Sequence, residues 1–174
     1  MEYLTALANV ALLASAIRLT VPILLTALGA VYTERGGVFN IGLEGTMIMG
    51  TFFGAAATHL VSQAASAPGA ASALAPTIGM LAAMMAGALF ALIHAVMAVT
   101  FRVDQLISGV ALNLLAVGLA RFLNILFFGV ATQSPGIGGF APLTIPGLRE
   151  IPALRPIATG ISPVIPAALL LVGV

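Results

Sequence analysis

The charged and polar side chains that could do chemistry gather in residues 32–54, within an otherwise apolar sequence. Three of the eleven charged residues (six basic, five acidic) lie there: Glu34, Arg35 and Glu44. Asn40 precedes Glu44 by four residues, so the two would share one face of a helix. Asparagine is also a favourable N-cap for the helix expected to start there. Charge within a membrane span is costly and is therefore a functional hypothesis by default.

Glycines interrupt the same stretch. Glycine pairs permit backbone conformations that break a helix. An apolar span, a glycine-rich interruption with polar groups and a second apolar span are typical of a discontinuous membrane helix, whose freed backbone lines a cavity. A short loop between two membrane helices, with Glu34 and Arg35 among lipid headgroups, is the alternative. Five glycines fall within fifteen residues: Gly36, Gly37, Gly42, Gly45 and Gly50.

The composition is that of an integral membrane protein. Hydrophobic residues make up 61% of the chain and charged residues 6%, whereas soluble domains carry roughly a quarter charged residues. All six basic residues are arginine and the net charge is +1, so no basic face for nucleic acid is expected. The absence of cysteine excludes a disulfide framework and thiol chemistry.

Apolar periodicity and length predict an all-α transmembrane helix bundle. The first span is either one helix kinked at Pro22 or a short interfacial piece followed by a span from about Arg18. Residues 62–76 form a predicted connector, and residues 131–163 a proline-rich loop. The last apolar run is too short to cross a bilayer, so we expect the N-terminal part of a longer protein. We treat the chain as one transmembrane domain with spans at about 4–32, 43–61, 77–101, 105–130 and, in part, 163–174.

Small residues predict where these helices approach one another closely. Gly50 and Gly54 form a GxxxG pattern in the second span. His94 lies beside a stripe of small residues and is expected to be a hydrogen-bonded packing residue rather than a proton relay. The stripe occurs on the third span, repeats every four residues and comprises Ala83, Gly87, Ala91 and Ala95.

The fourth span carries its strongly polar groups on one side. On a helical wheel, Asn113 and Asn124 lie about 20° apart and Arg121 lies about 60° beyond Asn124. Unpartnered polar groups in a bilayer are costly, so this face should turn toward protein or water. Glu44 is the candidate partner of Arg121.

Two stretches resemble a known family. Residues 34–50 read Glu-Arg-Gly-Gly-Val-Phe-Asn-Ile-Gly-Leu-Glu-Gly-Thr-Met-Ile-Met-Gly. This string resembles ABC importer permeases of the branched-chain amino acid, simple sugar and nucleoside type, and is most similar to the nucleoside and purine branch. Residues 103–119, Val-Asp-Gln-Leu-Ile-Ser-Gly-Val-Ala-Leu-Asn-Leu-Leu-Ala-Val-Gly-Leu, resemble the same branch. Asp104 replaces the asparagine that is usual there.

The resemblance implies the permease subunit of an ATP-driven importer in the bacterial inner membrane. Such a permease works by alternating access on a small polar solute, with nucleosides or purines favoured here. Expected partners are an extracytoplasmic binding protein that docks near residues 131–162, a second permease subunit in a heterodimer, and a separate ATPase subunit. ATP and Mg would be bound by that ATPase, because a chain without lysine holds no Walker A motif. The permease itself is then not an enzyme.

The resemblance and residue chemistry also suggest site residues. Asparagine and glutamate offer hydrogen bonds to ribose or base edges, and phenylalanine can stack on a ring. The expected substrate path comprises Phe39, Asn40, Glu44, Phe52, Asn113 and Arg121. The expected structural motif comprises Glu34, Arg35, Gly37, Gly42, Gly45, Gly50 and Gly54.

Other functions stay open from the residues alone. An ion-coupled secondary transporter could use the same broken-helix architecture with Glu44 as its titrating group. If the protein is an ABC importer permease, its substrate could also be a sugar or a branched-chain amino acid instead of a nucleoside. A membrane-embedded enzyme would need paired acids or a histidine cluster, but His59 and His94 lie on different spans with no motif around them, and no metal site is predicted.

Overall fold

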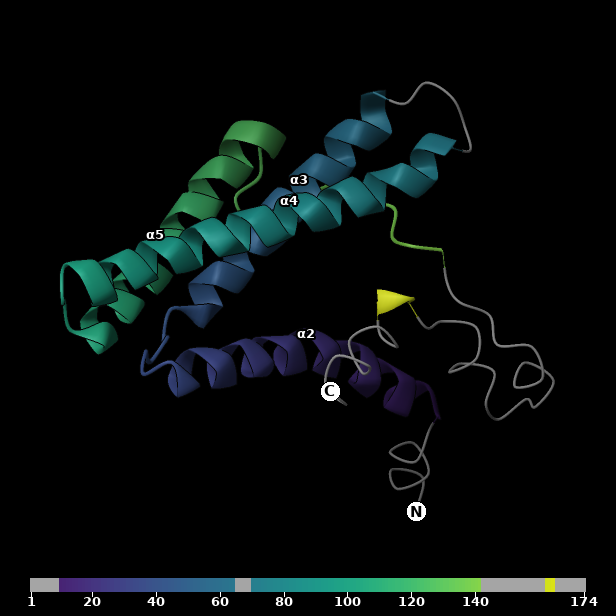
Figure 1. Ribbon diagram of the computed structural model, residues 1–174. Helices are drawn as coiled ribbons and strands as arrows, with labels where there is room; N and C mark the ends of the chain where they lie inside the picture. The colour runs from purple at the N-terminus through teal and green to yellow at the C-terminus, as the bar shows by residue number, and fades with distance from the viewer. Residues whose placement is uncertain (1–9, 65–69, 142–161, 165–174) are drawn as a thin grey trace, which may run out of the picture. The chain divides into compact units, whose positions relative to one another are not determined.

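The computed structural model describes residues 10–64, 70–141 and 162–164. Its elements are α2 (Val10–Arg35), α3 (Leu43–Ala64), α4 (Ala70–Ala95), the π-helix η1 (Val96–Thr100) and α5 (Gln105–Phe128) (Figure 1). The predicted all-α class is confirmed, and the glycine-rich stretch separates α2 from α3. Residues 30–139 form one compact unit, and the rest of the chain forms another. Two predicted spans, at about 4–32 and 163–174, lie partly outside the described residues, namely at 4–9 and 165–174.

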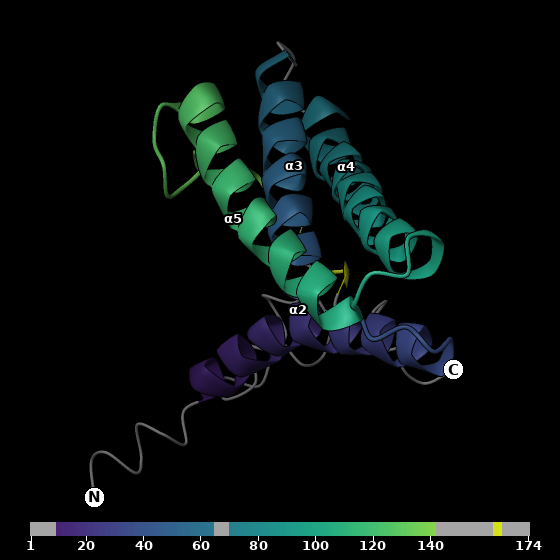
Figure 2. The same ribbon diagram turned by 90° about the vertical axis from the view of Figure 1, so that its left-hand side faces the viewer.

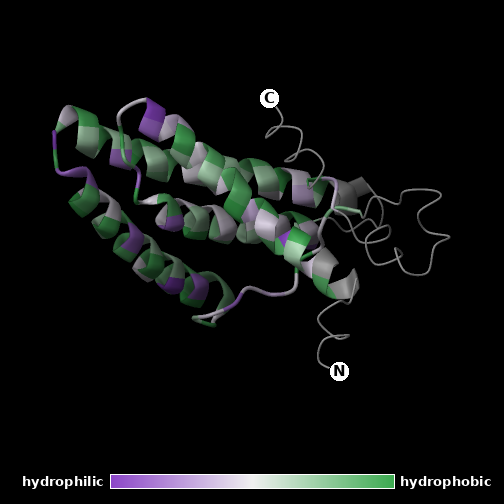
Figure 3. Ribbon diagram, turned by 90° about the horizontal axis from the view of Figure 1, so that it is seen from below, coloured by the Kyte–Doolittle hydropathy of each residue, from purple (hydrophilic) through white to green (hydrophobic). Residues whose placement is uncertain are grey.

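Within the compact unit, α3 lies between α4 and α5 and contacts both (Figure 2). Its buried centre takes one or more residues from each of the three helices: Met49, Phe90, Leu112, Ala116 and Ala120. Hydrophobic residues occur along the whole length of the helices rather than only in this centre (Figure 3). Large apolar side chains such as Met85 and Leu114 are more than 70% exposed within the chain. Such helices suit a lipid environment, where apolar side chains need no burial in protein.

Among the residues that the structure describes, three helical segments are long and apolar enough to cross a membrane: Ser15–Arg35, Leu74–Thr100 and Gln105–Phe128. The helix α3 is less apolar because it carries Glu44, His59 and three threonines. Although α3 lies between two other helices of the unit, only Thr58 among these polar residues is buried, and Glu44 is exposed.

The helix α2 runs without interruption through Pro22. The described residues therefore match the continuous first helix rather than a short piece followed by a separate span. Neighbouring side chains and local adjustments allow proline inside membrane helices. The hydroxyl of Thr26 donates to the Pro22 carbonyl oxygen at 2.8 Å, within the turn that follows the proline.

The predicted connector at residues 62–76 is too long. The helix α3 continues to Ala64, and α4 begins at Ala70 with Pro76 inside it. Four of the six residues from 70 to 75 are alanine, the residue with the highest helix propensity. Pro76 is the seventh residue of α4 and therefore lies beyond the first turn, where proline is well tolerated. Membrane helices nevertheless tolerate interior proline, and the alanines before it extend α4 toward its N-terminus.

The helices α3 and α4 approach each other at glycines. A Cβ atom on Gly79 would lie 2.7 Å from the Gly54 carbonyl oxygen and would also overlap the hydroxyl of Thr58. A Cβ atom on Gly54 would lie 3.1 Å from that of Ala83, and one on Gly50 would lie 3.3 Å from the Ala83 carbonyl oxygen. The GxxxG residues of α3 thus face the small residues of α4. The tightest of these, Gly79, lies one turn before the stripe predicted from Ala83 onward.

The turn between η1 and α5 explains the unusual Asp104. Its carboxylate oxygen accepts hydrogen bonds from the backbone N–H groups of Leu106 and Ile107, at 2.9 and 3.1 Å. Asp104 is therefore the N-cap of α5, where an acidic side chain satisfies free donors and complements the helix dipole. At the other end, Gly129 adopts φ 72° as the C-cap, so α5 ends at Phe128.

Candidate functional site

The break between α2 and α3 comprises residues 36–42. Gly37 adopts φ 79°, a left-handed conformation that favours glycine. Its N–H donates to the Glu34 carbonyl oxygen, and the N–H of Val38 donates to that of Thr33. These bonds satisfy carbonyls at the end of α2, as expected of a glycine C-cap.

Three side chains from α4 and α5 hold the backbone of the break. The Phe39 N–H donates to Gln105 Oε1 at 2.7 Å. The Asn113 amide bridges two points: its Oδ1 accepts from the Gly45 N–H at 2.7 Å, and its Nδ2 donates to the Ile41 carbonyl oxygen at 3.1 Å. Backbone groups freed at a helix break need such partners, particularly in a membrane.

His94 is the third of these side chains and is almost fully buried. Its Nε2 lies 3.3 Å from the Phe39 carbonyl oxygen, and its Nδ1 lies 3.2 Å from the Ser108 hydroxyl. A carbonyl oxygen only accepts, so this contact assigns the proton to Nε2 and leaves Nδ1 to accept from Ser108. His94 has the hydrogen-bonded packing position predicted for it.

The expected N-cap role of Asn40 is wrong. The helix α3 begins at Leu43, so Asn40 lies outside it and does not share a helical face with Glu44. The break passes close to α5 at Gly42, where a Cβ atom would lie 2.9 Å from Leu112 Cδ2, and α3 starts only after this contact. Asn113 instead caps the helix from across the interface. Asn40 Oδ1 is buried and has no hydrogen-bond partner among the described residues.

The two stretches that carried the family resemblance therefore pack against each other. A Cβ atom on Gly109 would lie 2.9 Å from the Gly42 backbone nitrogen. A Cβ atom on Gly45 would lie 3.1 Å from the Leu112 carbonyl oxygen. Glycine at these positions permits backbones to approach within hydrogen-bonding distance of Asn113.

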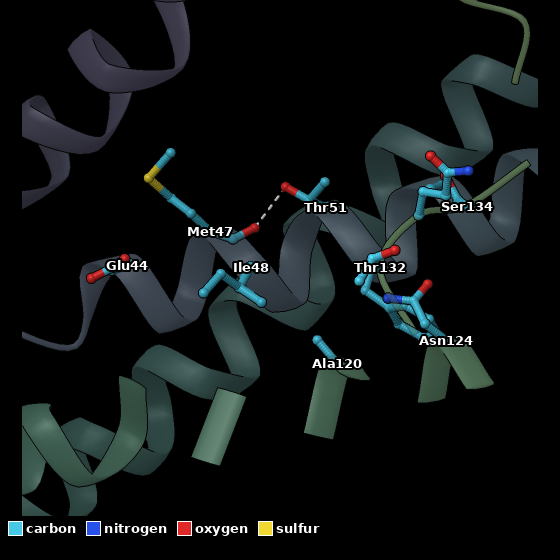
Figure 4. Close-up of a pocket in the computed structure, with 11 residues that line it drawn as sticks. Glu44, Met47, Ile48, Thr51, Ala120, Asn124, Thr132 and Ser134 are labelled. Carbon is cyan, nitrogen blue, oxygen red and sulfur yellow. Dashed lines mark hydrogen bonds between the residues drawn. The ribbon is translucent and has the colours of Figure 1, made fainter. Parts of the chain in front are cut away.

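An open groove of about 570 Å³ runs along the α3 surface toward α5 (Figure 4). Its volume falls within the range of about 300–1,000 Å³ usual for small-molecule sites. Glu44 lies at one end, whereas Asn124, Thr132 and Ser134 gather at the other (Figure 4). The lining residues are Glu44, Met47, Ile48, Thr51, Phe52, Ala55, Ala120, Asn124, Thr132, Gln133 and Ser134.

The middle of the groove is apolar and its ends are polar. Phe52 is 6% exposed and makes edge-to-face contacts with Phe53 and Phe127, with ring centroids 5.3 and 6.1 Å apart. These contacts hold its ring in place. The side chains of Glu44 and Asn124, by contrast, form no hydrogen bond or ion pair with any residue that the structure describes. An apolar wall with a few free polar groups is the usual character of a ligand site.

The groove brings together only part of the predicted substrate path. It contains Glu44 and Phe52, but Asn113 is used by the backbone of the break. Phe39 is 61% exposed and lines a separate depression with Arg102 and Gln105.

Arg121 is exposed, is not a groove residue, and forms no ion pair with Glu44 in the described part of the chain. It follows Asn113 by eight residues, which is about 12 Å along a helix, so it lies beyond the level of the α3 start. Asn124 was predicted to lie on the polar face of its helix but was not assigned to the substrate path. Its position beside Asn113 on the helical wheel is the signal that could have identified it as a groove residue. Thr132, Gln133 and Ser134 gave no such signal, because they follow α5 in irregular backbone.

Comparison with known proteins identifies the family. Residues 12–170 match the family described as branched-chain amino acid transport system / permease component. The chain is 47% identical over 133 residues to the guanosine ABC transporter permease protein NupQ of Bacillus subtilis, covering 76% of this chain and 40% of that protein. It is 36% identical over 135 residues to the nucleoside ABC transporter permease protein NupC of Lactococcus lactis, with the same coverage of 76% and 40%.

A third relative is more distant. The putative glucose ABC transporter permease protein TsgC13 of Haloferax volcanii is 30% identical over 135 residues, which cover 78% of this chain and 36% of that protein. The chain thus spans about 40% of the length of the curated relatives it matches. No solved structure matches it. Because the family match covers almost the whole chain, this protein belongs to the permease components of the branched-chain amino acid transport system family.

Proposed function

We propose that the chain is part of the membrane-spanning permease subunit of an ATP-driven importer of nucleosides. The observation that carries the proposal is 47% identity to a guanosine ABC transporter permease across 76% of this chain. The second nucleoside permease among its relatives, at 36% identity, supports the same substrate class.

The proposed system contains further subunits. An extracytoplasmic binding protein delivers the solute, and a second permease subunit of different sequence completes a heterodimer in the bacterial inner membrane. A separate ATPase binds ATP and Mg and drives alternating access. This chain has no lysine and hence no phosphate-binding Walker A motif.

In the proposed mechanism, the groove along α3 contributes to the solute path. Glu44 accepts hydrogen bonds from solute hydroxyls, and Phe52 supports a ring. Asn113, Gln105 and His94 hold the break, so that the start of α3 moves with α4 and α5 when the helices rock. Asn113 is required for transport in this mechanism because it holds in place the first turn of α3, which carries Glu44.

A sugar is the second candidate substrate. The observation in its favour is the 30% identity to a putative glucose permease. Ribose and glucose both present hydroxyl donors, which a carboxylate such as that of Glu44 accepts.

The test measures uptake by cells that lack their own nucleoside importers and express the complete transport system containing this chain. We expect uptake of labelled guanosine that unlabelled nucleosides compete and that glucose and leucine do not. Replacing the Walker A lysine of the partner ATPase should abolish uptake, whereas dissipating the proton gradient should not. Uptake of glucose instead of guanosine would establish the sugar alternative, and uptake independent of the ATPase would exclude the ABC mechanism.

A further inference from the structure

The two polar ends of the groove differ in hydrogen-bonding chemistry. The Glu44 carboxylate only accepts, whereas the Asn124 amide both donates and accepts. Asn124 lies with Thr132 and Ser134 at the end remote from Glu44 (Figure 4). Along α3 the lining extends from Glu44 to Ala55, which is eleven residue steps or about 16 Å of helix. The groove is therefore long enough for an elongated solute that presents different groups to each end.

A nucleoside has this two-ended chemistry. Its ribose carries hydroxyl donors at one end, which suit a carboxylate acceptor. The edge of a purine base carries donors and acceptors side by side, which an asparagine amide pairs with through two hydrogen bonds. Between them, the side of Phe52 that reaches the groove offers an apolar surface for the body of the solute.

Resting on the proposed function, we propose that Asn124 is a specificity residue that reads the purine edge, while Glu44 receives the ribose hydroxyls. The free state of both side chains supports this assignment. Asn113, on the same helix, has both ends of its amide engaged by backbone. Asn124 has no such partner among the residues that the structure describes, so its amide is available to a solute.

The decisive variant is Asn124→Asp, which keeps the side-chain shape and replaces the donor with an acceptor. Guanosine offers two adjacent N–H donors on its edge, which a carboxylate still accepts, whereas the adenosine edge includes a ring nitrogen that a carboxylate repels. A bidentate contact is worth about 1–3 kcal/mol of discrimination. We therefore expect the ratio of KM values for adenosine and guanosine to rise about tenfold.

Two further variants test the two ends of the groove separately. Every variant is measured by uptake through the full transport system. Glu44→Gln should reduce discrimination against 2′-deoxyguanosine several-fold without changing the adenosine to guanosine ratio. Asn124→Ala should remove discrimination against 1-methylguanosine, whose edge lacks one donor, and serves if the aspartate variant does not reach the membrane. Gln63→Ala is the matched amide control, since Gln63 is exposed at the end of α3 and, among the described residues, its side chain bonds only His59. It should leave every ratio unchanged.

The outcomes separate this inference from the proposed function. The inference is supported if the Asn124 variants change discrimination between bases and the Glu44 variant changes discrimination at the ribose. Equal loss of guanosine and adenosine uptake in the Asn124 variants would overturn it and leave a nucleoside importer in place. Absence of nucleoside uptake by the unaltered system would instead overturn the proposed function, and the inference with it.

Discussion

Asn113 and Asn124 lie on the same helix, eleven residues apart, and differ in what surrounds them. The region around Asn113 joins the break to α4 and α5, and its side chains Gln105, Asn113 and His94 are bonded to the backbone of the break or of the first turn of α3. In the groove around Asn124, the side chains of Asn124 and Glu44 have no hydrogen-bond partner among the described residues. Under the proposed function, the region around Asn113 is a rigid support and the groove contacts the solute. Variants in the first should therefore lower stability, and variants in the second should change transport alone.

The largest effect is expected from Gly109→Val, on the support side. A side chain there would meet the Gly42 backbone nitrogen and the Ile41 Cβ atom, both 2.9 Å from the new Cβ. Overpacking of this kind costs about 1–3 kcal/mol or more, because two backbones would have to separate. We expect strongly reduced membrane levels and a lower Tm in detergent. Gly118→Val is the control on the same helix, since Gly118 has open space at its Cβ.

Asn113→Ala tests the comparison most directly. It leaves the Gly45 N–H and the Ile41 carbonyl oxygen without the Asn113 amide. Gly45 is buried, so the loss at its N–H costs about 1–3 kcal/mol, whereas the exposed Ile41 carbonyl contributes less. We expect a lower Tm together with reduced uptake. Asn124→Ala should leave the Tm within error and alter uptake only. Equal destabilisation by the two substitutions would remove the distinction between support and solute contact.

His94→Ala is expected to have a similar or slightly smaller effect. It removes both ring contacts and leaves a cavity, because His94 is 1% exposed. His94→Gln should recover part of the lost Tm, since an amide can still donate to the Phe39 carbonyl oxygen. If alanine and glutamine variants unfold at the same temperature, the hydrogen bond to the break contributes no stability.

The smallest loss of stability is expected from substitutions of Asp104, which lies at the start of α5, at the edge of the region that supports the break. Asp104→Ala removes the N-cap of α5, which costs about 1 kcal/mol. Asp104→Asn should be close to neutral, because the two residues cap equally well. The same thermal unfolding measurement distinguishes them. A functional role for the charge would appear as reduced uptake by the asparagine variant at unchanged Tm.

Much of the helical architecture could be predicted from residue types. The break after Arg35, the helix from Gln105 and the close-packing role of Gly54 rest on glycine, proline and apolar content, which act locally. The prediction failed at residues 62–76 because alanine outweighed proline and glycine as a local signal. It also failed at Asn40, where a good capping residue is displaced by a close contact between Gly42 and α5.

The sequence by itself determined the membrane-helix class, the position of the break, the family resemblance and the polar character of one side of α5. Only the tertiary structure decided which of two similar asparagines holds backbone and which lines a groove. The physical reason is that hydrogen-bond satisfaction depends on the group opposite. For Asn113 that group is the backbone of residues 41 and 45, about seventy positions earlier in the chain. For Asn124 it is an open groove shared with α3 and residues 132–134.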